Sequence, residues 1–245
     1  MRLEKIFIVA LVFTFSLACN STSKNGEGKL IRAYHLKVEY KENPFIDEEV
    51  PRFSWELDGT GRGRSQTAYQ LLVAGSEDLL EQGRADFWDS EKQDAGQMSQ
   101  VEYTGKILEG RKKYYWKVRA WDEAGKPGKW SKPAIFETAF LSQDNWQASW
   151  IGYDLTDLGK GEIFHLPPAP YLRKDIQLKD DIKSARLYST ALGVYDFHIN
   201  GKKVGNDYLN PGWTNYHKRV NYQAYDVTTY LTQGENALSS VLSYG

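Results

Sequence analysis

Cysteine, histidine and net charge are all scarce in this sequence, and each shortage excludes a class of protein. Only one cysteine occurs in 245 residues, so no disulfide can form within the chain. The four histidines, at positions 35, 165, 198 and 217, lie far apart without metal-ligand spacing, which argues against a zinc site. Because 31 Lys and Arg balance 32 Asp and Glu, no global field favours nucleic acid or anionic lipid, and a neutral partner is expected.

Long hydrophobic runs are also lacking. The longest, residues 6–17, has 12 residues and follows the basic Arg2 and Lys5. A membrane-spanning helix needs about 20 apolar residues, so this run is typical of the central region of a secretory signal. We therefore expect an exported protein.

The only cysteine, Cys19, directly follows Ala18 at the end of that apolar run. This position is similar to a bacterial lipoprotein cleavage box, and a lone cysteine in an exported chain calls for a role. The alternative is ordinary cleavage after Ala18, since Ser16 and Ala18 are both small enough. The sequence predicts a signal peptide over residues 1–19 with lipidation at Cys19, then a polar tether over residues 20–29. A lipid-anchored protein, periplasmic or on the cell surface, would result.

Residues 30–141 show the pattern of a first β-sandwich. Short alternating segments at 36–40, 52–57 and 67–73 are separated by turn residues. In the segment that follows residue 112, Tyr114, Trp116 and Val118 alternate with polar or charged neighbours, which predicts a strand with one core face. The segment resembles the last two strands of a fibronectin type III domain. Tyr114 is either the corner tyrosine of that fold or a plain core aromatic residue.

Residues 145–245 show the pattern of a second β-sandwich. Tyr195, Phe197 and Ile199 alternate with polar residues, and Asn200-Gly201 follows them. Asn-Gly predicts a tight hairpin because both central residues of a type I′ turn need positive φ. Residues 143–152 are interpreted as the hinge between the sandwiches, residues 154–170 as a long loop, and 237–245 as the start of a buried strand. The predicted fold class is all-β.

Several motifs occur in an order that resembles the N-terminal region of bacterial α-L-rhamnosidases, glycoside hydrolase family 78. In the second sandwich the motifs are Leu192-Gly193, Asn200-Gly201, Val204-Gly205, Pro211-Gly212-Trp213-Thr214 and Tyr225-Asp226-Val227-Thr228. Upstream they are residues 51–55 (PRFSW), 66–70 (QTAYQ), 87–90 (FWDS), 115–119 (YWKVR) and 146–151 (WQASWI). The resemblance implies a galactose-binding-type jelly roll after the first sandwich. It also implies a catalytic α/α barrel beyond Gly245, so the chain is expected to be an N-terminal fragment with an incomplete jelly roll.

The sequence contains no recognisable catalytic site. A glycosidase needs two carboxylates at a fixed separation, and the acidic residues here fall mostly in turns and on solvent-facing strand positions. No nucleophile motif, phosphate loop or metal-ligand cluster is present. We therefore assign no catalytic residue.

One loop and its flanks have the side chains that bind sugars, namely aromatic faces beside amides and charged groups. The candidates are Asn206, Asp207, Trp213, Asn215, Tyr216 and Arg219. The alternative is structural: Trp213 packs between the domains and Tyr216 closes the sandwich. Some members of the family use this sandwich as a calcium-dependent rhamnose-binding module, and Asn206 or Asp207 could be an oxygen ligand, although no metal site is secure.

Two functions follow from these patterns. The first is the N-terminal accessory, carbohydrate-binding fragment of an exported rhamnosidase that hydrolyses terminal α-L-rhamnose from a glycan or glycoside. The alternative is a free-standing, lipid-anchored carbohydrate-binding module without catalysis. Translating the reading frame beyond Gly245 would distinguish them.

Overall fold

The structure is a computed structural model that describes residues 31–60, 62–152 and 168–243. The predicted signal, Cys19 and the tether lie outside the described residues, as does most of the predicted loop 154–170. The described chain is almost entirely β, with one short helix α1 (Glu77–Glu81) and two 3₁₀ turns, η1 (Gln143–Asn145) and η2 (Thr228–Tyr230). No helix in these described segments is long and apolar enough to cross a membrane.

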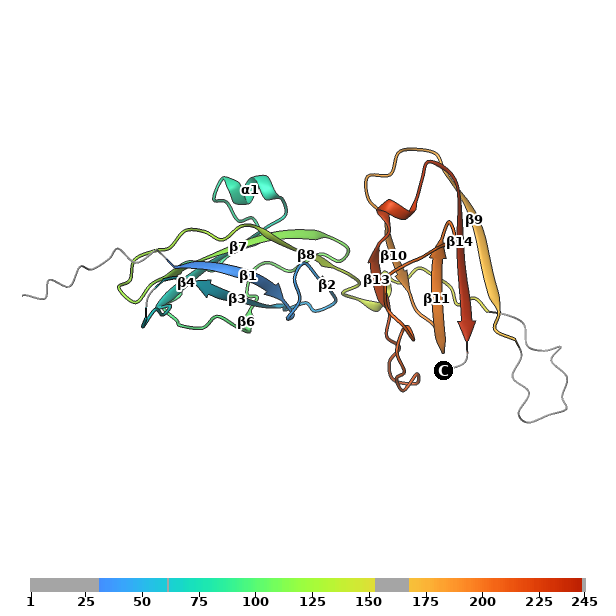
Figure 1. The fold of residues 1–245 in the computed structure, drawn as a ribbon, viewed down its shortest axis with the longest axis horizontal. Coiled ribbons are helices and arrows are strands. Elements are labelled where there is room, and N and C mark those ends of the chain that lie inside the picture. Colours follow the sequence, from blue (N-terminus) through green and yellow to red (C-terminus); the bar gives the residue numbers. More distant parts are fainter. Residues whose placement is uncertain (1–30, 61, 153–167, 244–245) are drawn as a thin grey trace, which may run out of the picture.

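Two antiparallel-type sheets form the first sandwich (Figure 1). One sheet has the order β1-β3-β6, built from β1 (Arg32–Val38), β3 (Arg52–Asp58) and β6 (Val101–Glu102). The other has the order β2-β8-β7-β4-β5, built from β2 (Phe45–Ile46), β8 (Ala134–Thr138), β7 (Lys113–Trp121), β4 (Ala68–Ala74) and β5 (Trp88–Asp89). Only the short β2–β8 pair is parallel.

Aromatic rings from both sheets fill the core of this sandwich. Phe53 of β3 lies edge-on to Trp116 of β7, with ring centroids 4.8 Å apart, and edge-on to Phe136 of β8 at 5.8 Å. Tyr114 is fully buried, and its hydroxyl accepts a hydrogen bond from the backbone N–H of Glu109 at 2.7 Å. Because this ties a strand start to the backbone upstream, Tyr114 has the contact of a corner tyrosine and is also a core residue, so features of both sequence alternatives are present.

On the outer face of the same sheet, cations and indole rings alternate. The guanidinium carbon of Arg119 lies 4.8 Å from the ring centre of Trp121 and 4.7 Å from that of Trp130. Lys117 follows, 5.1 Å from Trp130, and its amine donates to the backbone carbonyl of Leu80 at the end of α1. This stack covers the outer face of the sheet beside α1, and burial lowers the pKa of Lys117.

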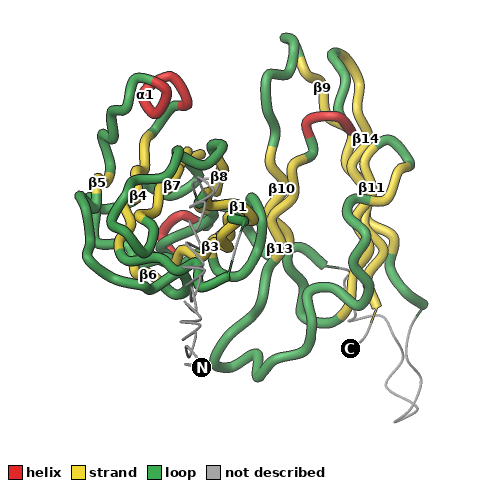
Figure 2. The backbone as a smooth tube through the Cα atoms, turned by 60° about the vertical axis from the view of Figure 1, so that its left-hand side comes forward, coloured by secondary structure: helices red, strands yellow, loops and turns green. Residues whose placement is uncertain are grey.

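A four-stranded sheet and a two-stranded sheet form the second sandwich, and Figure 2 shows them as two separate layers. The larger sheet has the order β12-β11-β14-β9, built from β12 (Lys202–Lys203), β11 (Val194–Ile199), β14 (Gly234–Ser243) and β9 (Tyr171–Leu178). The smaller pairs β10 (Arg186–Ser189) with β13 (Gln223–Asp226). The predicted all-β class, a fibronectin-like sandwich followed by a second sandwich, is confirmed.

The Asn-Gly hairpin of this second sandwich also forms as predicted. Asn200 and Gly201 have φ of 50° and 77°, which is the left-handed conformation that a type I′ turn requires. The turn brings β12 back against β11, with His198 opposite Lys203. The second sandwich has a small buried hydrophobic cluster, which consists of Ile199, Val204 and Val227 with partly buried neighbours.

Candidate functional site

A cleft of about 920 Å³ lies in the second sandwich, bounded on one side by the linker, residues 143–152. Strands β10 and β11, the loop between β12 and β13, and residues of β9 and β14 supply the other walls. Aromatic side chains line it, among them Trp146, Trp150, Tyr188, Tyr195, Tyr216 and Tyr222. Clefts of this size with mostly apolar walls are the usual form of small-ligand sites.

Tyrosine hydroxyls provide part of the polar inventory of the cleft walls. Tyr195 donates to the side-chain carbonyl of Gln223 at 2.8 Å and shares a 2.6 Å hydrogen bond with the hydroxyl of Ser189. Tyr188 has a buried hydroxyl that finds no partner among the described residues. Burial raises the pKa of Tyr188 and Tyr195, and it raises the pKa of Tyr222 to about 12. These phenols therefore stay protonated at neutral pH.

The charged residues that line the cleft, Lys218 and Arg219, have one sign. No Asp or Glu of the described chain lines it. A pair of carboxylates is the minimum for general acid–base hydrolysis of a glycosidic bond. The described lining of the cleft holds no such pair.

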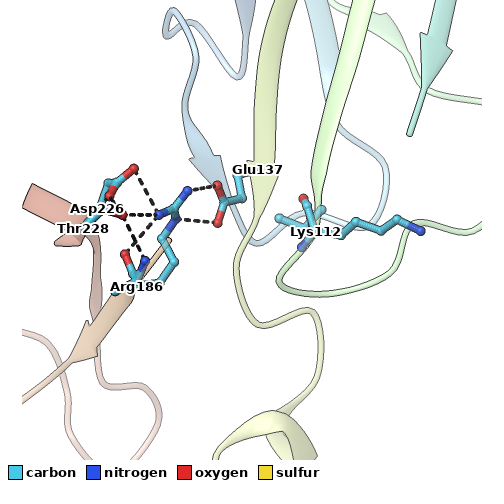
Figure 3. A network of polar contacts seen from close by, with 7 residues as sticks. Lys112, Glu137, Arg186, Asp226 and Thr228 are labelled. Carbon is cyan, nitrogen blue, oxygen red and sulfur yellow. Dashed lines mark hydrogen bonds and ion pairs between the residues drawn. The ribbon is translucent and has the colours of Figure 1, made fainter. Parts of the chain in front are cut away.

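A polar joint holds the two sandwiches together beside this cleft (Figure 3). Arg186 of β10 donates from Nε and Nη2 to the two carboxylate oxygens of Glu137 in β8, at 2.8 and 2.9 Å. Its Nη1 also lies 3.0 Å from a carboxylate oxygen of Asp226. The side chains of Arg186 and Glu137 are only 16% and 12% exposed, so solvent screens this pair weakly.

An aromatic cluster extends the joint into the cleft wall. Phe140, just after β8, has its ring centre 4.3 Å from that of Tyr188 and 4.6 Å from that of Trp146. Trp146 in turn lies edge-on to Tyr222 at 5.3 Å, and the hydroxyl of Tyr222 accepts from the backbone N–H of Phe140 at 3.3 Å. The linker wall of the cleft is thus fixed against both sandwiches.

The six residues selected from sequence for sugar binding do not all gather in one place. Tyr216 and Arg219 line the cleft, and the hydroxyl of Tyr216 accepts from the backbone N–H of Gly193 at 3.1 Å. Trp213 is 80% exposed and lies outside the lining. The alternative in which Trp213 packs between the domains is therefore wrong.

The remaining three candidates are exposed on the loop between β12 and β13 and are likewise absent from the cleft lining. Asp207 accepts a hydrogen bond from the hydroxyl of Tyr225 at 3.0 Å. Asn215 is occupied by its own turn, where its side-chain oxygen accepts from the N–H of His217 at 3.2 Å. Asn206 is exposed beside Asp207. Sequence reasoning missed Trp146, Tyr188 and Tyr222 as site residues, because each reads as an ordinary hinge or strand aromatic.

Calcium fits poorly at the position considered for it. The described residues contain no group of three or more His, Cys, Asp or Glu side chains that could hold a metal ion. Near Asn206 the only carboxylate on the loop is Asp207, and one of its oxygens already accepts from Tyr225. Since calcium takes six to eight oxygen ligands, these residues do not form its cage.

Two consecutive β-sandwiches, with an aromatic cleft in the second, define the class of this chain: an all-β region of two domains. Residues 33–142 match the model of the Rha78A-like, N-terminal immunoglobulin domain, and residues 180–245 match the α-L-rhamnosidase N-terminal domain. Over both matched segments the chain therefore resembles the N-terminal region of α-L-rhamnosidases, as the sequence motifs indicated.

Individual relatives agree with this assignment. An α-L-rhamnosidase of Formosa agariphila is 38% identical over 98% of this chain and 26% of its own length. The α-L-rhamnosidase structure from Dictyoglumus thermophilum shares 36% identity over 87% of this chain and 25% of that chain, with a TM-score of 0.80. The α-L-rhamnosidase structure from Streptomyces avermitilis, complexed with L-rhamnose, shares 28% identity over 87% of this chain and 22% of that chain, with a TM-score of 0.50. The chain thus spans about a quarter of the length of its curated relatives.

Proposed function

We propose that this chain is the carbohydrate-binding accessory region of an exported α-L-rhamnosidase, and that the whole protein hydrolyses terminal α-L-rhamnose from glycans or glycosides. The cleft is the observation that carries the binding role, because it combines aromatic walls with tyrosine hydroxyls and excludes carboxylates. Aromatic faces stack on the apolar faces of sugars, and hydroxyl groups fix their orientation. The family match supports L-rhamnose as the sugar.

The 245-residue chain is proposed to bind without hydrolysing. The described cleft lining supplies no carboxylate to act as acid or base, and loss of either group typically costs at least about 10²-fold in rate. The test is titration calorimetry of the chain with L-rhamnose, together with an assay on a chromogenic α-L-rhamnoside. We expect binding and no turnover. If a Tyr216→Ala variant bound L-rhamnose as tightly as the wild type, the sugar site would lie elsewhere. Turnover by the chain would overturn the accessory role.

Membrane attachment through Cys19 is part of the same proposal. Its support is the sequence alone, where Cys19 follows a small residue at the end of the apolar run. Replacing Cys19 with Ser and separating membrane from soluble fractions tests it. The variant is expected in the soluble fraction, and equal membrane association of both proteins would disprove lipidation.

A further inference from the structure

A chain of hydrogen bonds in the cleft wall ends at Ser189, and the backbone determines its direction. The chain runs from the carbonyl of Pro211 through the side chains of Gln223 and Tyr195 to the hydroxyl of Ser189. A backbone carbonyl can only accept, so the group of Gln223 that lies 3.2 Å from the oxygen of Pro211 is its side-chain NH₂ group. The side-chain oxygen of Gln223 therefore faces the hydroxyl of Tyr195.

Each hydroxyl proton in this chain can then be assigned. The side-chain oxygen of Gln223 can only accept, so Tyr195 donates its single proton across the 2.8 Å contact. The backbone carbonyl of Ser189 lies farther from that hydroxyl, at 3.3 Å. Because the Tyr195 proton is used, the 2.6 Å contact between the two hydroxyls requires Ser189 to donate. The oxygen of Ser189 keeps lone pairs that can accept, and apart from Tyr195 no side chain of the described residues bonds to it.

The neighbouring hydroxyls of the cleft have polarities that can be read in the same way. Thr190 donates to the backbone carbonyl of Asn221 at 2.6 Å, so its oxygen, like that of Ser189, is left to accept from a ligand. Tyr216 has the reverse polarity, since its oxygen accepts from the backbone N–H of Gly193 at 3.1 Å and its proton stays free to donate. Ser189, Thr190 and Tyr216 all line the cleft. The lining therefore presents acceptors at the end of β10 and a donor on the loop between β12 and β13.

A preset acceptor in a partly buried wall discriminates between ligands. If the ligand brings no donor to it, the acceptor loses its hydrogen bonds to water without replacement, and affinity falls. A site that bonds a hydroxyl group rejects the analogue without that hydroxyl more strongly than an apolar pocket rejects a small change of size. Tyr195 is only 3% exposed, so water has little access to the phenol that fixes the polarity of Ser189.

We propose that Ser189 is a specificity-determining residue of the cleft, which accepts a hydrogen bond from one ring hydroxyl of the bound sugar, and that Tyr195 is the positioning residue that sets this polarity. This rests on the proposed function, because it assumes that the cleft holds L-rhamnose. It adds a requirement among neutral ligands: the sugar must present a hydroxyl group that donates at the Ser189 position. A sugar with hydrogen or fluorine at that position is rejected.

A series of ligand analogues tests this on the full chain by calorimetry. Methyl α-L-rhamnoside is compared with derivatives in which one ring hydroxyl at a time is replaced by hydrogen or by fluorine. Fluorine accepts weakly and cannot donate, so at the hydroxyl that bonds Ser189 both replacements are expected to weaken binding equally, by about fivefold to tenfold. At a hydroxyl that accepts from Tyr216, fluorine should weaken binding less than hydrogen does. This comparison needs no variant and so does not depend on any variant folding.

Variants then locate the acceptor. Ser189→Ala should bind methyl α-L-rhamnoside and the two derivatives at that position equally, whereas Ser189→Thr, which keeps a hydroxyl, should still discriminate. In Tyr195→Phe the proton of Ser189 is free to donate to the ligand, so the fluorine derivative should bind better than the hydrogen derivative. Loss of packing alone would not produce this reversal. The matched control is Ser184→Ala, at an exposed serine outside the cleft lining, which should leave every affinity ratio unchanged.

The outcomes that contradict the proposal differ in their reach. If fluorine restored affinity at every position, if every derivative bound as tightly as methyl α-L-rhamnoside, or if the loss persisted in Ser189→Ala, Ser189 would not be the acceptor. Sugar binding by the cleft would then stand. If methyl α-L-rhamnoside itself did not bind, both the role of Ser189 and the proposed function would be refuted.

Discussion

The joint between the two sandwiches should be a strong pairwise interaction, and Glu137→Gln is the change that tests it. The wild-type carboxylate accepts two hydrogen bonds from Arg186, at 2.8 and 2.9 Å, in a largely buried setting. Charge-assisted bonds of this kind contribute about 1.5–3 kcal/mol each to stability, net of the bonds to water that they replace. Removing one partner of a buried pair costs about 3–5 kcal/mol, because the other charge stays behind unpaired.

The expected cost of removing the Glu137 charge is smaller than this range, because Arg186 has a second partner. Arg186 keeps Asp226 as a second partner at 3.0 Å, although that carboxylate side chain is 56% exposed. We therefore expect Glu137→Gln to lower the unfolding free energy by about 2–3 kcal/mol. In a double-mutant cycle with Arg186→Met, the coupling energy between the two positions should be about 2 kcal/mol.

Urea unfolding of the four proteins of the cycle measures this coupling. The matched control is the Arg173–Asp175 pair on β9, which has a similar bond length of 2.9 Å but side chains that are 68% exposed. Exposed pairs couple by about 0–1 kcal/mol, so the control cycle should give the smaller value. If the two cycles gave equal coupling, burial of the joint would have no energetic consequence and the reasoning would fail.

Three further predictions concern stability. Arg119→Leu should lower the unfolding free energy of the chain by about 2 kcal/mol in a denaturant assay, since Trp121 and Trp130 both lose a stacked cation. In the same assay, Arg84→Leu at an exposed position should change the unfolding free energy by no more than about 0.5 kcal/mol. Because burial raises the pKa of Tyr222 to about 12, the unfolded chain loses this proton near pH 10 while the folded chain keeps it. Stability should therefore fall as pH rises from about 10 to 12, and Tyr222→Phe should reduce the slope of unfolding free energy against pH by up to one proton; an unchanged slope would refute the assignment. When the two segments are expressed separately, residues 30–141 should show a cooperative thermal transition and residues 145–245 should not. The reason is that the first sandwich has a continuous aromatic core, whereas the second buries only a small cluster. Cooperative unfolding of residues 145–245 would contradict this prediction.

Features set by local rules could be predicted from sequence. Asn200-Gly201 forms the expected turn because Asn and Gly adopt positive φ at a lower steric cost than other residues. Tyr114 binds the backbone five residues upstream, a contact that was one of the two alternatives that the strand pattern left open. In both cases the interacting groups lie within a few residues, so no knowledge of tertiary arrangement was needed.

The joint and the cleft depend on arrangement and could not be predicted. Arg186 and Glu137 are 49 residues apart, and each sits on a strand where the pattern says only that the residue is polar. Trp146 and Tyr222 meet in the cleft wall only because the linker folds back against β13. An aromatic residue in a hinge has the same sequence signature whether it ends exposed, as Trp150 does, or packed, as Trp146 does.

The candidate sugar-binding residues show why an inventory of suitable side chains overestimates a site. Short polar side chains in a loop are used first by the loop itself, because a nearby backbone or side-chain partner costs little entropy to reach. Asn215 closes its own turn, and Asp207 holds Tyr225, so neither lines the cleft. Tyr216 and Arg219 have longer side chains, extend beyond the turn that Asn215 closes, and do line it. Side-chain length, weighed with the hydrogen bonds that the loop needs for its own conformation, separates Tyr216 and Arg219 from Asn215 and Asp207. It does not separate them from Trp213, which is long but 80% exposed and outside the lining.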